Sequence, residues 1–182
     1  MTYHSELCRA MKELGELPNT VFMGQGVARH GGTTMSDTFL GVPEDKLLEM
    51  PVAEDMQLGM ALGMAIEGVL PICIFPRWNF IECASNQLVN HLDRLVLYSD
   101  GGYHPRVIIR TAIPSYQPFD PGPQHDDDFT DSYRAKLRTV KVKRLEKAED
   151  IVSAYRAAVE GTVSVVLAEY TERYKDVRAG GE

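Results

Sequence analysis

The sequence lacks the features that mark a disulfide-rich, zinc-binding or secreted protein. It has only three cysteines, Cys8, Cys73 and Cys83, and no two of them are spaced as CxxC. An odd number at irregular spacing predicts neither a disulfide framework nor a zinc site, and it favours a reducing cytoplasm. The N-terminal residues include acidic side chains and no long apolar core, so no signal peptide is predicted.

Positive charge and long hydrophobic runs are also scarce. The chain has 19 Lys and Arg against 26 Asp and Glu. The resulting net charge of −7 argues against a nucleic-acid-binding protein, which needs a basic face. The most apolar stretch, residues 50–75, is interrupted near its middle by Glu67, Pro71 and several glycines, so no membrane span is expected. With 182 residues, 44% of them hydrophobic, the chain suffices for one globular domain.

Several familiar catalytic and nucleotide-binding motifs are missing. No GxGxxG follows a predicted strand, no GxxxxGK[ST] occurs, and there is no GxSxG elbow. The glycines of GQGVARHGG, residues 24–32, have the wrong spacing for phosphate binding, so this segment is interpreted as a loop. Cys83 falls inside a predicted helix, where a packing role is expected rather than a nucleophilic one.

What is present is a regular alternation of apolar strands and helical patterns. Strands are predicted at residues 20–24, 70–75, 106–113, 139–145 and 164–170, helices at 3–17, 53–68, 79–99, 129–138 and 147–161, and a short helical turn at 43–50. This alternation predicts one α/β domain over residues 1–182, with a mostly parallel sheet, helices on both faces and a polar tail at 171–182. Ligands of such sheets bind beyond the carboxyl ends of the strands, where GQGV, FPRWNF and PSYQPFDPGPQHDDD fall.

The predicted helix at residues 53–68 has almost no polar face. Methionines, small residues and aliphatic side chains each form one of its stripes, and Gly59 and Gly63 have small-xxx-small spacing. A helix that is apolar all round must be enclosed on all sides. It is either a central core helix or a helix at a subunit interface, and the sequence leaves both interpretations open.

Three features near the expected ligand edge are candidates for chemistry. Glu54 lies in the first turn of the apolar helix, where the positive helix end stabilises a carboxylate by ~0.3–1 kcal/mol. Alternatively, the apolar surroundings desolvate it and prepare it to exchange a proton near neutral pH. His125, in a loop rich in Pro and Gly, is a candidate acid or base, and the adjacent aspartates allow a metal site. Trp78 and Phe80 are either core residues or a platform for a flat heterocycle.

These segments occur together in an order typical of a known family. The stretch from Pro51 to Asn90 contains a Pro-x-x-Glu, a helix rich in Gly, Ala and Met, a G-x-x-P-I-C turn and an N-F…Q-x-V-N helix. Together with VFMGQGV, VIIRTA and GPQHDDD, it resembles the pyrimidine-binding domain of thiamine-diphosphate enzymes. The sequence looks most like the beta subunit of the first component of 2-oxoacid dehydrogenase complexes and, more distantly, transketolase. The resemblance runs from about Val21 to the last strand.

The resemblance implies roles for three residues. Glu54 falls on the glutamate that hydrogen-bonds the aminopyrimidine ring of thiamine diphosphate and favours the imino tautomer that activates the thiazolium carbon. Phe80 falls where the family places an aromatic ring against the pyrimidine. His125 falls on the loop histidine that serves the substrate or intermediate. The cofactor performs the difficult chemistry, while the protein sets its tautomer and orientation.

The resemblance also implies partner chains. No diphosphate-and-magnesium motif of the Gly-Asp-Gly…Asn kind occurs, so a separate diphosphate-binding subunit is expected to complete the cofactor site and hold Mg²⁺. The helix from Glu54 to Gly68 would mediate self-association in a heterotetramer. The sequence departs from the family at Gln25 and Gly26, where an acid is common, and at Asp126 and Asp127, where the family loop reads Ser-Gln. The chain also ends where the family's C-terminal domain would begin.

The sequence therefore predicts a pyrimidine-binding subunit of a split thiamine-diphosphate enzyme that acts on a 2-oxoacid or a ketose. The bond cleaved or formed would lie next to a carbonyl. Two alternatives remain: a non-catalytic scaffold or regulatory homologue of that domain, and a metal hydrolase built on His125 and its neighbouring aspartates.

Overall fold

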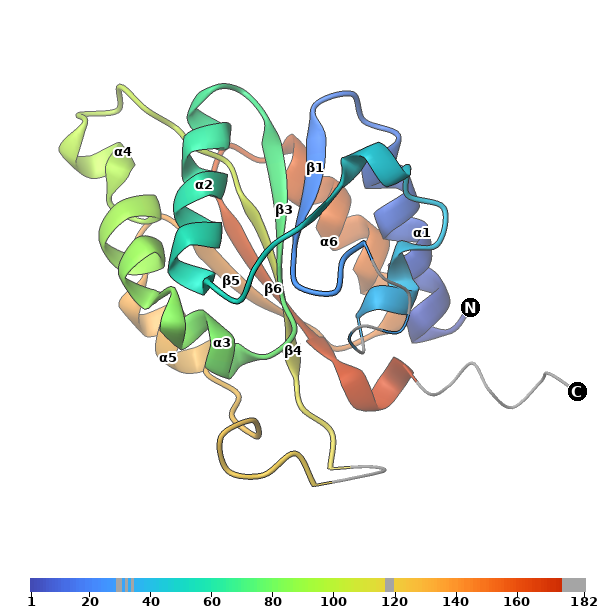
Figure 1. The fold of residues 1–182 in the computed structure, drawn as a ribbon. Coiled ribbons are helices and arrows are strands. Elements are labelled where there is room, and N and C mark those ends of the chain that lie inside the picture. The colour runs from blue at the N-terminus through green and yellow to red at the C-terminus, as the bar shows by residue number, and fades with distance from the viewer. Residues whose placement is uncertain (29–30, 32, 34, 117–119, 175–182) are drawn as a thin grey trace, which may run out of the picture.

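One sheet of parallel strands organises the chain. The computed structural model describes residues 1–28, 31, 33, 35–116 and 120–174. Within these residues the sheet has six strands, in the order β2 (Leu47–Glu49), β1 (Thr20–Gly24), β3 (Leu70–Phe75), β4 (Ile108–Ile113), β6 (Val165–Tyr170) and β5 (Lys141–Leu145). Every neighbouring pair is parallel (Figure 1). The predicted α/β fold with a parallel sheet is confirmed.

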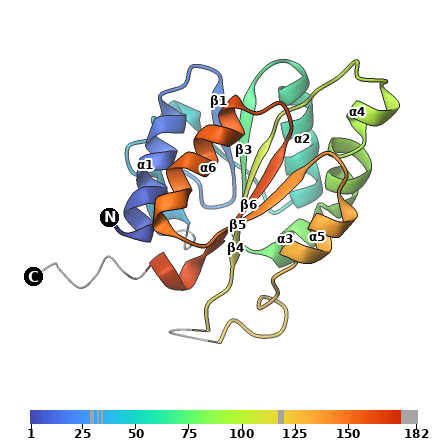
Figure 2. The same cartoon turned by 180° about the vertical axis from the view of Figure 1, so that it is seen from behind.

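Helices cover both faces of the sheet, also as predicted. On one face α1 (Tyr3–Gly15) and α6 (Ala148–Glu160) lie side by side (Figure 2). The other face carries α2 (Glu54–Ile66), α3 (Trp78–Cys83), the π-helical η3 (Gln87–Leu92), α4 (Leu95–Tyr98) and α5 (Thr130–Lys136). Two short 3-10 helices, η1 (Ser36–Phe39) and η2 (Glu44–Lys46), lie between β1 and β2.

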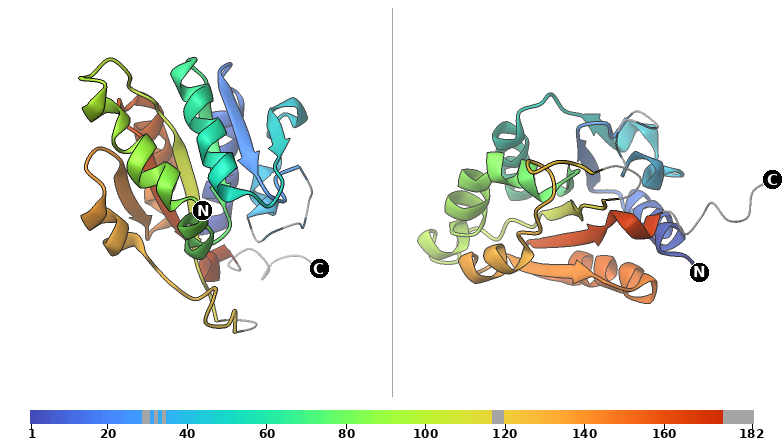
Figure 3. Two further views of the ribbon diagram at one scale, coloured as in Figure 1. Left: turned by 60° about the vertical axis from the view of Figure 1, so that its left-hand side comes forward. Right: turned by 90° about the horizontal axis from the view of Figure 1, so that it is seen from below.

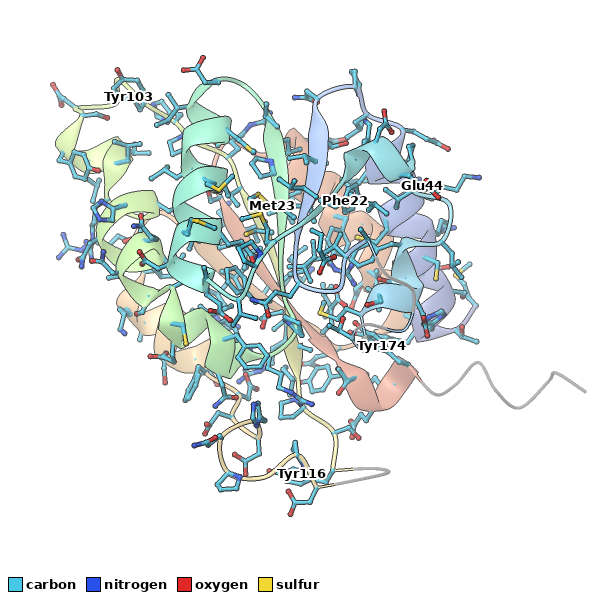
Figure 4. The ribbon with its side chains drawn as sticks, in the orientation of Figure 1. Phe22, Met23, Glu44, Tyr103, Tyr116 and Tyr174 are labelled. Carbon is cyan, nitrogen blue, oxygen red and sulfur yellow. The ribbon has the colours of Figure 1, made fainter. Side chains whose placement is uncertain are left out.

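Neighbouring residues of β1 show how one strand builds two cores. Phe22 belongs to the cluster formed with α1 and α6, whereas Met23 belongs to the cluster formed with α2, α3 and α5 (Figure 4). Successive side chains point to opposite faces because a strand has a period of two. At Gly24 a β-carbon would come within 2.6 Å of the Ile74 carbonyl oxygen. Glycine is therefore required where β1 ends against β3.

A buried ion pair joins β4 to β6 on the face covered by α1 and α6. Arg110 donates two hydrogen bonds to the carboxylate of Glu169, at 2.7 and 2.8 Å, and one to the Thr38 hydroxyl at 3.1 Å. Tyr155 and Tyr174 also donate to Glu169. Burial, together with the Glu169 carboxylate, raises the pKa of both tyrosines well above the ordinary value.

The start of the predicted polar tail is ordered by this network. Residues 171–174 form a 3-10 turn, and Tyr174, labelled in Figure 4, is buried by its contact with Glu169. The remainder of the predicted tail, residues 175–182, lies outside the described residues, as do residues 29, 30, 32 and 34 of the predicted loop after β1 and residues 117–119 of the loop after β4.

The prediction of one long helix at residues 79–99 is wrong, because the structure has three shorter helices there. The break centres on Asp93, whose backbone N–H bonds the Leu88 carbonyl in a π-helical turn. That turn brings the Asp93 carboxylate into the interior, where it accepts backbone N–H groups from Arg138, Thr139 and Val140 at 2.7–3.0 Å. The apolar periodicity of residues 79–99 could not predict this break, because the N–H groups that Asp93 accepts belong to a distant segment.

The interpretation of residues 43–50 as only a helical turn is also incomplete. The turn exists as η2, but it passes directly into β2, which pairs with β1 through Leu47, Leu48 and Glu49. A three-residue edge strand has too few positions to show an alternating pattern, and its formation depends on the neighbouring strand.

Helix α2 is not enclosed within the chain, so the interpretation as a central core helix is wrong. One face is buried and carries Gln57, Leu58, Ala61 and Ala65. On the opposite face Met56, Met60 and Ile66 are exposed by 44%, 39% and 42%. The interface interpretation therefore remains.

Candidate active site

The sheet changes its winding direction between β1 and β3. From β1 the chain moves outward to β2 and then returns past β1 to add β3, β4 and the remaining strands on the other side. At such a switch point the connections diverge, and a crevice forms outside the carboxyl ends of the two strands. The right-hand view of Figure 3 looks onto this edge of the sheet.

A pocket of about 190 Å³ lies at this edge. Its lining is contributed by the segments that follow β1, β3 and β6: Gln25, Thr33, Pro76, Arg77, Phe80 and Thr171. Among the described residues, the lining combines the aromatic ring of Phe80 and the cation of Arg77 with amide and hydroxyl groups, a composition suited to a polar ligand with a flat part.

Glu54, the first residue of α2, reaches this pocket through Gln25. The Gln25 amide donates to Glu54 Oε1 at 3.2 Å and to the Pro51 carbonyl at 3.4 Å. Glu54 is half-buried, and its Oε2 accepts no hydrogen bond from any described residue. One carboxylate oxygen is thus held by the chain, and the other is available to a ligand.

Phe80 and His125 lie in contact, although 45 positions of sequence separate them. Their rings meet edge to face, with centroids 5.5 Å apart and planes at 77°. Phe80 belongs to α3, whereas His125 belongs to the loop that leaves β4. An aromatic ring and an imidazole are therefore presented together at the carboxyl edge.

Hydrogen bonds join the His125 loop to the start of α3. Asn79 donates to a carboxylate oxygen of Asp127 at 2.7 Å, and Arg77 donates to the His125 carbonyl at 3.5 Å. Farther out, the Tyr116 hydroxyl bonds Asp126 at 3.3 Å, and Figure 4 shows Tyr116 near the outer end of the loop. These contacts set the position of His125 relative to Phe80.

The structure thus brings together two of the three residues that the sequence singles out. Glu54 is linked to the pocket by its hydrogen bond with Gln25, which lines the pocket together with Phe80. The functional roles of all three residues remain predictions. Sequence reasoning missed Arg77 and Thr171; the only available signal for Arg77 was its place directly after Pro76 at a strand end.

The described residues give no support to the metal-hydrolase alternative. Among them, no group of three or more His, Cys, Asp and Glu side chains is arranged to hold a metal ion. His125 contacts Phe80, and the neighbouring aspartates bond other side chains.

Of the helices within the described ranges, none has both the length and the hydropathy needed to span a bilayer.

Comparison with known proteins agrees with this architecture. A family model described as the transketolase pyrimidine binding domain matches residues 2–177. The mitochondrial pyruvate dehydrogenase E1 component subunit beta of Caenorhabditis elegans is 29% identical over 172 residues, which cover 93% of this chain and 48% of that protein. The 2-oxoisovalerate dehydrogenase subunit beta of Bacillus subtilis (strain 168) is 24% identical over 181 residues, covering 98% and 54%. The chain thus spans about half the length of these two relatives.

Solved structures show the same fold. A chain described as a split gene transketolase, inactive beta4 tetramer, superimposes with a TM-score of 0.71 at 20% identity, over 94% of this chain and 52% of that one. Transketolase from Leishmania mexicana superimposes with a TM-score of 0.72 at 15% identity, over 93% and 25%. Because some relatives are mitochondrial, the cytoplasmic location expected from the sequence stays a prediction. The family match over nearly the whole chain shows that this protein belongs to the transketolase pyrimidine-binding domain family.

Proposed function

We propose that this chain supplies the pyrimidine half of a thiamine-diphosphate site, which a separate diphosphate-binding subunit completes. The reaction would cleave or transfer a carbon–carbon bond next to the carbonyl of a 2-oxoacid or ketose. One observation carries the proposal: a half-buried glutamate with one free carboxylate oxygen opens α2 beside a pocket that contains an aromatic ring.

The residues present fit the pyrimidine part of the cofactor. Glu54 Oε2 is free to hold a proton toward a ring nitrogen, while the bond from Gln25 to Oε1 restricts the side chain to one orientation. Phe80 offers an apolar face for a flat ring. The chemistry that bound thiamine diphosphate supplies is nucleophilic attack on a carbonyl carbon. His125 would transfer a proton to or from the substrate, since it lies against Phe80.

The exposed face of α2 supports assembly with further copies of the chain. Met56, Met60 and Ile66 form an apolar stripe, and a β-carbon at Gly63 would meet no atom within 4 Å. An apolar helix face that is open in the single chain favours a protein contact. The solved neighbour described as an inactive beta4 tetramer of a split gene transketolase supports the view that such chains associate with one another.

The test is a substitution at Glu54 in the complex with its partner. Affinity purification of the tagged chain from its host supplies the partner, and turnover is measured with thiamine diphosphate, Mg²⁺ and a panel of 2-oxoacids and ketoses. Glu54→Gln keeps size and hydrogen-bonding capacity but cannot exchange the proton. We expect turnover to fall by a factor of about 10²–10⁴, the usual contribution of a positioned acid or base.

Asp55→Asn is the matched control. Asp55 is the adjacent acid, it is exposed, and it accepts a bond from Gln87 outside the pocket. We expect Asp55→Asn to retain the activity of the parent. Equal turnover of Glu54→Gln and the parent would remove the role assigned to Glu54, and a parent complex without any turnover would favour the scaffold alternative.

A further inference from the structure

Arg77 is a cation in the pocket lining, and none of the described residues forms an ion pair with it. Its guanidinium makes one long hydrogen bond, from Nη1 to the His125 carbonyl at 3.5 Å. Among the described residues, no carboxylate oxygen lies within the 4.0 Å of an ion pair with Arg77, whereas Arg144 pairs with both Asp128 and Asp131. Arg77 is only half-exposed, so solvent reaches it incompletely.

The acids nearest in the loop are held by other partners. Asp127 accepts the amide of Asn79 at 2.7 Å, Asp126 accepts the hydroxyl of Tyr116 at 3.3 Å, and Asp128 pairs with Arg144 at 2.9 Å. The three aspartates that follow His125 lie in the loop that Arg77 contacts, but none of them pairs with the Arg77 guanidinium.

The other polar groups of the lining have already used their hydrogens within the chain. The two N–H groups of the Gln25 amide point to Glu54 and Pro51. The Thr171 hydroxyl donates to the Ile113 carbonyl at 3.0 Å. These groups can therefore accept a hydrogen bond from a ligand, but they have no hydrogen left to donate to one.

Thr33 is committed in the same way. The Ser36 hydroxyl donates its single hydrogen to the Gly26 carbonyl at 2.6 Å, so in the 3.1 Å contact between the Thr33 and Ser36 hydroxyls the hydrogen must come from Thr33. Of the described lining side chains, only Arg77, with five N–H groups and one long bond, has donors to spare.

We propose that Arg77 is the anion-binding group of the pocket and that the substrate carries an acidic group, a carboxylate or a phosphate, which pairs with it. The proposal rests on the proposed function and adds the residue that recognises the acidic group of the substrate. A planar guanidinium matches both oxyanions through two parallel N–H···O bonds, and an incompletely solvated cation gains most from such a pair. The ring of Phe80, on the same wall, is apolar and does not discriminate between charged ligands. The charge of Arg77 is therefore the feature that favours an anion.

The test compares substrates with and without the acidic group in the complex. Parent, Arg77→Gln and Arg77→Lys are assayed with pyruvate, 2-oxoglutarate, fructose 6-phosphate and unphosphorylated fructose. We expect Arg77→Gln to lower kcat/KM about 10- to 150-fold for the acidic substrates that the parent accepts, as befits a lost hydrogen bond to a charged group, with little change for any neutral one. Arg77→Lys should retain part of the activity because it keeps the charge without the fork.

The substrate panel separates the possible sources of the anion. A loss with 2-oxoglutarate but not pyruvate identifies a distal carboxylate, a loss with both identifies the carboxylate next to the carbonyl, and a loss with the phosphorylated sugar identifies a phosphate. Arg138→Gln is the control, since Arg138 is exposed and its hydrogen bond to Asp93 is made by its backbone N–H, which the substitution keeps. An equal effect on acidic and neutral substrates, no effect, or a raised KM for thiamine diphosphate alone would overturn the proposal.

Failure of the proposed function is distinguishable. If the parent complex turns over no substrate, the isolated chain is titrated with 2-oxoglutarate and with inorganic phosphate while the arginine Nε–H signals are followed by NMR. A shift of one signal that is absent from Arg77→Gln supports the anion site without the enzymatic role. Absence of any such shift in the parent chain would refute the site.

Discussion

Replacing Gly63 by alanine should stabilise the single chain while it weakens association between chains. Gly63 lies inside α2 with helical backbone, it is exposed, and a β-carbon there would meet no atom within 4 Å. Alanine loses less backbone freedom on folding, so the exchange in a helix interior gains about 0.5–1 kcal/mol. At about 2–4 °C per kcal/mol for a chain of this size, Tm should rise by about 1–4 °C.

Gly63→Ala is expected to weaken the association between chains, although it stabilises the single chain. If α2 packs against a second copy of the chain, the missing side chain at Gly63 is where the two backbones approach. An added methyl group in a close-packed contact costs about 1–3 kcal/mol, which corresponds to association about 5- to 150-fold weaker. Gly63→Leu should have the larger effect, since it adds four carbon atoms where alanine adds one.

The assay needs two measurements on the same proteins. Thermal unfolding of dilute chain reports the stability of the single chain, and sedimentation equilibrium over a range of concentrations reports its association. Gly68→Ala is the control, because Gly68 also faces open space but has a φ of +88°. A side chain there is strained by about 1–2 kcal/mol, so Gly68→Ala should lower Tm.

Two results would refute the reasoning. Unchanged association of Gly63→Leu would show that the exposed face of α2 is not the contact between chains. A lower Tm for Gly63→Ala in dilute solution would show that the space beside Gly63 is filled in the single chain.

Three further predictions concern the fold. Asp93→Ala leaves three backbone N–H groups of the α5–β5 connection without an acceptor and should cost about 3 kcal/mol or more in urea unfolding; a loss below about 1 kcal/mol would contradict this anchoring. Burial raises the pKa of Cys73 to about 12, so iodoacetamide near pH 8 should modify exposed Cys83 and spare Cys73 until the chain unfolds; mass spectrometry decides. The paired hydrogen bonds from Arg156 lower the pKa of Glu13. The parent should therefore have a larger free energy of unfolding than Glu13→Gln near neutral pH, and this difference should disappear as the pH falls below about 4. A difference that does not change with pH would argue against the pair.

Strongly apolar elements that are bounded by breakers could be located from the sequence. The strands at Thr20–Gly24 and Leu70–Phe75 coincide with their predicted ranges, and α2 begins one residue after its predicted start. Each of these segments is apolar at nearly every position, so its own residues were enough to locate it. The break of the helix at residues 79–99 was not visible, because it serves the carboxylate of Asp93 and a segment 45 positions away.

The same distinction between local pattern and tertiary contacts applies to the candidate site. The order of segments and their resemblance to a family were enough to single out Glu54, Phe80 and His125 and to place them beyond the carboxyl ends of parallel strands. These assignments follow from local pattern, and the matched segments occur in sequence order.

Only the tertiary structure decided which groups meet at that edge. It joined Gln25 to Glu54, turned the three aspartates after His125 toward other partners, left Arg77 without a counter-ion among the described residues, and exposed one face of α2. Each of these depends on distances between segments that the order of strands in the sheet brings together. A linear sequence specifies which side chains exist, but hydrogen bonds and ion pairs form only within a few ångströms, so their partners are fixed by the fold.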